Sequence, residues 1–77
     1  MLKLSRHAQE RMEQRNISKS DILEALKAGN AKPSKGNMVV RNKVSSRNDY
    51  PLQVVYSLDT VNRKVVIVSC YWKGLND

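Results

Sequence analysis

Residues 4–29 read LSRHAQERMEQRNISKSDILEALKAG, and this segment predicts two helices joined by a short turn. Ser5 is a suitable N-cap for the first helix, because its hydroxyl can accept a hydrogen bond from a backbone N–H of the first turn. Residues 6–15 contain no glycine, proline or β-branched residue that would oppose a helix. Only residues 16–18 separate this helix from the next, so we expect the two helices to pack as neighbours.

The second helix has the clearer start. Asp21 follows Ser18 by three positions, which is the spacing of a capping box, in which each side chain accepts from the other's backbone N–H. Ile17 and Ile22 stand at the positions of a hydrophobic staple across this start. Gly29 is a typical C-terminal stop. We therefore expect the second helix between Ser18 and Gly29.

The rest of the chain predicts strands. Residues 29–37 are a loop by composition. Segments 38–44, 52–58 and 64–72 are rich in β-branched and aromatic residues with partial alternation, and residues 59–62 form the hairpin turn between the last two. The last segment is apolar on both sides over four residues, so we expect it at the centre of the sheet. Alternation places even-numbered and odd-numbered side chains of each strand on opposite faces, with one face of the middle strand formed by Leu52, Val54, Tyr56 and Leu58.

This element order predicts an α+β fold, in which two N-terminal helices pack on one face of a small antiparallel sheet of three or four strands. Residues 1–77 are expected to form a single domain, too small for a deep cofactor cavity. One histidine and one cysteine cannot build a three- or four-ligand zinc site or an internal disulfide, so we expect no metal and no cofactor. The chain shows neither an apolar signal core nor a run near the ~20 apolar residues of a membrane helix. This predicts a cytoplasmic protein with no membrane partner.

The charge points to a polyanion. The chain carries 14 Lys and Arg against 7 Asp and Glu, a formal net charge of +7, and such basic domains commonly bind nucleic acid. Between residues 32 and 47 there are five basic residues and no acidic one. Arg41, Lys43 and Arg47 are the candidates to follow an RNA backbone along a strand and loop. The alternative is an edge strand that its charges protect from edge-to-edge pairing.

His7, Arg11 and Arg15 follow one another at intervals of four residues on the first helix. Helical geometry places them within an arc of about 80°, beside the apolar stripe, so we expect them to line a groove where helix meets sheet. An imidazole can transfer a proton near neutral pH, and guanidiniums can stabilise the charge on a phosphate in the transition state. The structural alternative is that His7 caps a strand end or packs on Met12, while the arginines pair with Asp49, Asp59 or a main-chain carbonyl.

Residues 4–18, LSRHAQERMEQRNIS, followed by Asp21-Ile22 and Ala28-Gly29, resemble a bacterial domain family of unassigned function. Its members begin with His-Ala, arginines spaced by four, and then Ile-Ser before a second helix. That family is grouped with the RelE-like and barnase-like RNase toxins, whose shared architecture is two helices leading into a small antiparallel sheet. The resemblance is specific over residues 4–29 and looser beyond them.

What this resemblance implies is a metal-independent endoribonuclease of toxin type, or a relative that has lost the activity. His7, Arg11 and Arg15 match the family's motif directly. Tyr71 is similar in position to the tyrosine or other polar residue that completes the site near the final strand of related toxins.

The predicted function is therefore RNA cleavage without a metal. The ribose 2′-hydroxyl attacks the adjacent phosphate and leaves a 2′,3′-cyclic phosphate. His7 is expected to act as general base or acid, and Arg11 and Arg15 to hold the reacting phosphate. Tyr71 or Ser69 is expected to serve as the second proton relay.

Two other interpretations remain open. The first is a non-catalytic RNA-binding or nucleic-acid-binding protein, in which Tyr56 stacks on a base, although such tyrosines are more often half-buried residues of a sheet. The second is an interaction module, such as a phage- or plasmid-type inhibitor of an enzyme that handles nucleic acid. A toxin would also need an acidic antitoxin or immunity protein to cover its basic groove.

Overall fold

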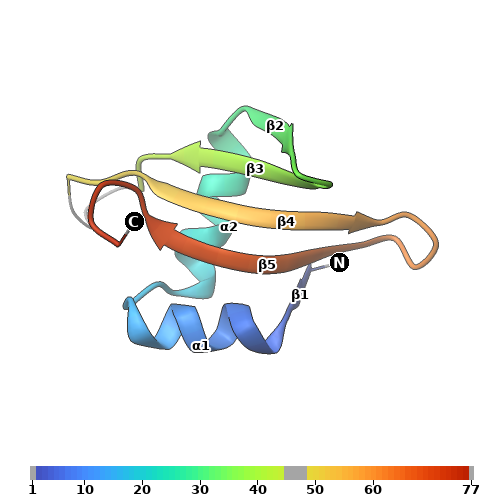
Figure 1. Cartoon of the computed structure of the whole chain (residues 1–77), viewed down its shortest axis with the longest axis horizontal. Coiled ribbons are helices and arrows are strands. Elements are labelled where there is room, and N and C mark those ends of the chain that lie inside the picture. Colours follow the sequence, from blue (N-terminus) through green and yellow to red (C-terminus); the bar gives the residue numbers. More distant parts are fainter. Residues whose placement is uncertain (1, 45–48, 77) are drawn as a thin grey trace.

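The computed structural model describes residues 2–44 and 49–76, in which two helices cover one face of a five-stranded sheet (Figure 1). The helices and strands are α1 (Arg6–Gln14), α2 (Lys19–Ala28), β1 (Leu2–Leu4), β2 (Ala31–Ser34), β3 (Asn37–Asn42), β4 (Leu52–Asp59) and β5 (Lys64–Trp72). The strand order across the sheet is β1-β5-β4-β3-β2. Within the described ranges, neither helix is long and apolar enough to cross a membrane.

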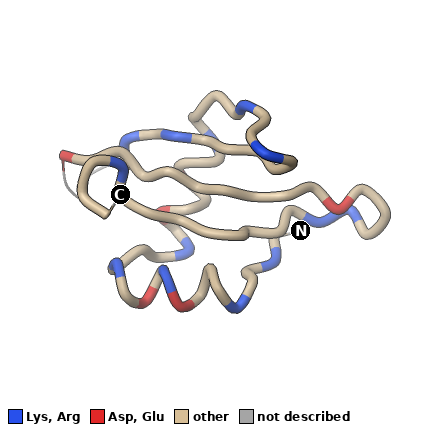
Figure 2. Tube along the Cα trace, in the orientation of Figure 1, with Lys and Arg blue, Asp and Glu red and all other residues tan. Residues whose placement is uncertain are grey.

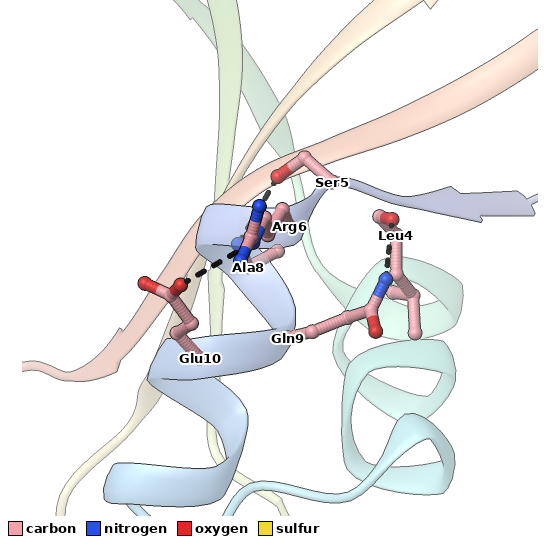
Figure 3. A network of polar contacts seen from close by, with 6 residues as sticks. All are labelled: Leu4, Ser5, Arg6, Ala8, Gln9 and Glu10. Carbon is pink, nitrogen blue, oxygen red and sulfur yellow. Dashed lines mark hydrogen bonds and ion pairs between the residues drawn. The ribbon is translucent and has the colours of Figure 1, made fainter.

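Both predicted helices are confirmed, together with their caps, but the expectation that they pack as neighbours is wrong, because α1 packs on β5 and α2 on β3 and β4. The Ser5 hydroxyl accepts a hydrogen bond from a backbone N–H in the first turn of α1 at 3.1 Å (Figure 3). At the start of α2, Ser18 Oγ accepts from the Asp21 N–H at 3.0 Å, and the Asp21 carboxylate accepts from the Ser18 N–H at 2.9 Å. Ile17 and Ile22 are both buried, so the expected staple forms beside the capping box.

The three predicted strands are confirmed as β3, β4 and β5, but the prediction of an antiparallel sheet of three or four strands is wrong. Two further strands are present, and β1 pairs with β5 in parallel, so the sheet is mixed. Its central strand is β4 and not β5 as expected, although β5 is an inner strand because β1 covers its other edge. β1 has three residues, too few to show alternation. β2 contains Lys32 and Pro33 and is exposed throughout, which explains why its composition predicted a loop. Lys35 and Gly36, with φ of 48° and 83°, form the tight turn to β3, as in a type I′ hairpin.

The core lies between the helices and the inner face of the sheet. The helices and the turn between them contribute Ala8, Ile17, Ile22 and Ala25, and the strands contribute Val40, Leu52, Val54, Tyr56, Ile67, Cys70 and Trp72. A β-bulge interrupts β5, because Ser69 pairs with Val55 while Ile67 pairs with the next residue of β4. Ile67 and Cys70 therefore both face the core, and the strict odd–even alternation predicted for this strand is wrong at the bulge.

Candidate nucleic-acid interface

Three polar residues lie side by side across the outer face of the sheet, which neither helix of the described residues covers. The strand register places Arg41 of β3 opposite Gln53 of β4, and Gln53 opposite Tyr71 of β5. Arg41 Nε donates to Gln53 Oε1 at 2.9 Å, and Gln53 Nε2 donates to the Tyr71 hydroxyl at 2.5 Å. The neighbours of Gln53 in β4 belong to the core, so alternation turns Gln53 to the outer face. With 9% of its surface exposed, Gln53 is a buried amide whose two ends are both used.

Arg15 extends this arrangement beyond the edge of β5. β1 pairs with β5 only as far as Ile67, and Arg15, the C-cap of α1, lies alongside the following stretch of strand. Its Nη1 donates to the carbonyl of Cys70 at 2.8 Å, and its guanidinium carbon lies 6.0 Å from the centre of the Tyr71 ring. The indole N–H of Trp72 donates to the Arg15 carbonyl at 2.8 Å, which fixes the backbone there. We call Arg15, Arg41, Gln53 and Tyr71 the polar row.

The three α1 residues predicted to form one site, His7, Arg11 and Arg15, do not all lie together. His7 is exposed in the first turn of α1, and Arg11 is half-buried and donates to the Gln14 side chain at 2.6 Å. Eight residues at 1.5 Å each separate His7 from Arg15 by about 12 Å along the helix axis. The structure therefore brings Arg15 to Tyr71 and leaves His7 at the other end of α1. For Arg15, the alternative of pairing with a main-chain carbonyl is also realised.

The residues predicted to bind RNA divide into three groups. Arg41 belongs to the polar row, and Lys43 is exposed just beyond β3. Arg47 lies outside the described residues. Tyr56 is placed in the core with 9% of its surface exposed, because its position in β4 faces the helices, so the expectation of a ring open to a stacking base does not fit this placement.

Gln53 is the member of the polar row that the sequence analysis missed. Its position between Leu52 and Val54, on the face opposite these apolar residues, was the available signal. Pairing it with Arg41 and Tyr71 required the register of two hairpins, which alternation within one strand does not give.

Charge is distributed unevenly over the molecule. Figure 2 shows Lys and Arg on β2, β3 and the hairpin between them with no Asp or Glu, whereas α1 carries both signs. On the solvent side of α1, Arg6 and Glu10 form an exposed ion pair at 3.8 Å (Figure 3). The excess positive charge is thus available on the strands, where Arg41 lies.

The side chains of the polar row are of kinds that can bind a phosphate group. Neighbouring strands are about 4.8 Å apart, so the backbones at Arg41 and Tyr71 are separated by about 10 Å, with the buried Gln53 between them. A guanidinium group can form hydrogen bonds to two phosphate oxygens at once, and a tyrosine hydroxyl can donate a hydrogen bond or a proton. Among the described residues, no three His, Cys, Asp or Glu side chains gather as a metal site.

Comparison with known families gives one match. The family model described as "Domain of unknown function (DUF4258)" matches residues 4–72, nearly the whole chain. No curated protein and no solved structure matches the chain.

Proposed function

This chain belongs to the DUF4258 family, and from its own residues we propose that it binds single-stranded RNA on the outer face of its sheet and cleaves it without a metal ion. The observation that carries the proposal is the polar row. Two arginines and a tyrosine follow one another there, Arg41 and Tyr71 on the sheet face that neither described helix covers and Arg15 at its edge, in a chain with net charge +7. Binding of this kind gains affinity from the phosphates and weakens as salt rises.

The proposed reaction needs two proton transfers. The 2′-hydroxyl oxygen attacks the adjacent phosphorus as its proton leaves, the bond from phosphorus to the 5′-oxygen breaks, and that oxygen takes up a proton. The products are a 2′,3′-cyclic phosphate and a 5′-hydroxyl. Tyr71 is the hydroxyl of the polar row that can donate the proton taken up by the 5′-oxygen, the proton of the 2′-hydroxyl passes to water, and Arg15 beside the Tyr71 ring supplies positive charge for the reacting phosphate.

His7 and Arg11 have a part in this reaction only if the RNA also passes along the edge of β5 towards α1. Their spacing on the helix and their match to the motif support that path. The distance of about 12 Å along the axis between His7 and Arg15 opposes a single compact site. The His7→Ala variant decides whether His7 takes part. If the RNA passes along β5 to His7, the variant abolishes cleavage; if the reaction is confined to the polar row, the variant cleaves as the wild type does.

The decisive experiment is incubation of single-stranded RNA with purified protein in excess EDTA, followed by analysis of the product ends. We expect 2′,3′-cyclic phosphate ends with the wild type, and a loss of about 10²-fold or more in rate with Tyr71→Phe. An uncut substrate, or equal cleavage by wild type and Tyr71→Phe, would contradict the proposal of catalysis at the polar row.

A second candidate function is RNA binding without cleavage. It is favoured by the hydrogen bonds that these side chains already make within the protein. Gln53 Nε2 donates to the Tyr71 hydroxyl, and Arg15 Nη1 donates to the Cys70 carbonyl. Salt-sensitive binding by the wild type with no product at any time would support this candidate over the first.

The relation to RelE-like and barnase-like RNase toxins is part of the same proposal. Its support is the element order, in which α1 and α2 lead into the antiparallel strands β2 to β5. A toxin in the cytoplasm would require an acidic antitoxin or immunity protein that covers Arg41 and the neighbouring basic strands. Co-expression with the product of an adjacent gene for a small acidic protein tests this partner.

A further inference from the structure

A polar groove of about 670 Å³ lies beside the polar row, between the end of α2 and the β2–β3 hairpin. It exists because β2 pairs with β3 only as far as Val40, so the last two residues of β3 extend beyond their neighbour. The residues that line the groove include Asn30, Lys32, Val39, Arg41, Asn42 and Gln53. None of the nine described residues that line the groove is acidic.

We propose that this groove is a nucleotide subsite, which takes one unpaired nucleotide of the RNA and holds its phosphate between Lys32 and Arg41. The inference rests on the proposed function, because Arg41 and Gln53 belong both to the groove and to the polar row. It adds a recognition site for the base, which the polar row by itself lacks.

The two cations are placed to hold one phosphate. Lys32 pairs with Val39, and Arg41 is two residues further along β3, so the two are diagonal neighbours on the outer face. Such neighbours lie about 7–8 Å apart, within reach of two long side chains. Arg41 Nε donates a hydrogen bond to Gln53, and this bond orients the guanidinium. The two Nη groups of Arg41 can then donate to a phosphate. Two like charges at this spacing repel, and a bound anion removes the repulsion.

The rest of the groove fits a base. Its volume is within the range of about 300–1,000 Å³ that holds small ligands. Asn30 and Asn42 bring amide groups, each a donor and an acceptor, which suits the edge of a nucleobase. Val39 brings an apolar surface for the face of the base. A base can enter such a groove only when it is unpaired and unstacked, so the ligand is single-stranded RNA and not a duplex.

The test is NMR titration of the isotope-labelled chain with adenosine and uridine monophosphates, ribose 5-phosphate and inorganic phosphate. We expect saturable shifts of the backbone amides of Asn30, Arg41 and Asn42, with the nucleotides binding more tightly than ribose 5-phosphate or inorganic phosphate. Lys32→Ala should weaken nucleotide binding by about tenfold. Lys3→Ala removes the same charge from β1, the opposite edge strand, and should leave binding within about twofold.

Three results would overturn the subsite: shifts confined to other parts of the molecule, inorganic phosphate binding as tightly as the nucleotides, or equal weakening by Lys32→Ala and Lys3→Ala. Failure of the proposed function looks different. If nucleotides bind in the groove while RNA stays uncut, the subsite stands and cleavage is refuted. If wild type and Lys32→Ala cut RNA equally and no nucleotide binds, cleavage stands and the subsite is refuted.

Discussion

Removing the hydroxyl of Tyr71 should destabilise the protein through a neighbouring residue. In Tyr71→Phe, Gln53 Nε2 loses the oxygen to which it donates at 2.5 Å. Because only 9% of the Gln53 surface is exposed, water cannot readily replace that oxygen. A buried donor left without a partner costs about 1–3 kcal/mol. In a domain of this size each kcal/mol lowers Tm by about 4–8 °C, so a loss of about 2 kcal/mol lowers it by about 8–16 °C.

Thermal unfolding followed by circular dichroism measures this effect. Tyr56→Phe is the control for removal of a tyrosine hydroxyl, because Tyr56 is a buried residue of the same sheet and its hydroxyl makes no hydrogen bond within the described residues. We expect a clearly smaller change in Tm for this control.

A double variant then separates the lost hydrogen bond from any change in packing. Replacing both partners, in Gln53→Leu with Tyr71→Phe, leaves no orphaned amide and should restore most of the lost stability. A Tm for Tyr71→Phe within about 1 °C of the wild type would refute the reasoning. So would a double variant whose loss of stability equals the sum of the losses of the two single variants.

Three further predictions concern α2 and the core. Ser18→Ala breaks the capping box and should lower the free energy of unfolding by about 1 kcal/mol. Ser20→Ala, at an exposed position of the same helix, should lower it less. Chemical denaturation measures both, and equal losses would contradict a stabilising role of the cap. Gly29→Ala would place a Cβ 2.2 Å from a Val40 methyl, so it should lower Tm. Adding Val40→Ala to the same chain should recover part of the loss. A Tm of Gly29→Ala equal to that of the wild type would contradict the close packing. Burial raises the pKa of the Cys70 thiol to about 11, above its ordinary 9, so the folded protein keeps the thiol protonated and loses stability as pH rises from about 9 to 11. Labelling by iodoacetamide at pH 8 should accordingly require unfolding, and rapid labelling of the native protein would contradict this.

The parts of the fold that local sequence determines were predictable. The capping box of Ser18 and Asp21 joins residues three positions apart, and the turn before it joins residues five apart, so the pattern shows them directly. β1 and β2 were not predictable, because strands of three and four residues carry too little pattern and form only when β5 and β3 offer a partner. Pro33 in β2 further concealed the strand, since proline is tolerated only at sheet edges and ends.

The polar row was only partly within reach of the sequence. Arg15, Arg41 and Tyr71 could be named individually from helical spacing, charge and resemblance. Their relation through Gln53 depends on the register of β3, β4 and β5, which side-chain alternation within one strand does not fix. The placement of Tyr56, by contrast, follows from the alternation it shares with Leu52, Val54 and Leu58.

The central claim is that RNA is held by the outer face of the sheet and not merely by the net charge. Fluorescence anisotropy with a labelled, uncleavable 2′-O-methyl single-stranded RNA tests it by comparing Arg41→Ala with Arg6→Ala. Each variant removes one positive charge, but Arg41 lies in the polar row while the Arg6 side chain is 96% exposed on the far side of α1. We predict about tenfold weaker binding for Arg41→Ala and a change within about twofold for Arg6→Ala. Equal weakening by the two variants, or no binding by the wild type at low salt, would contradict the claim.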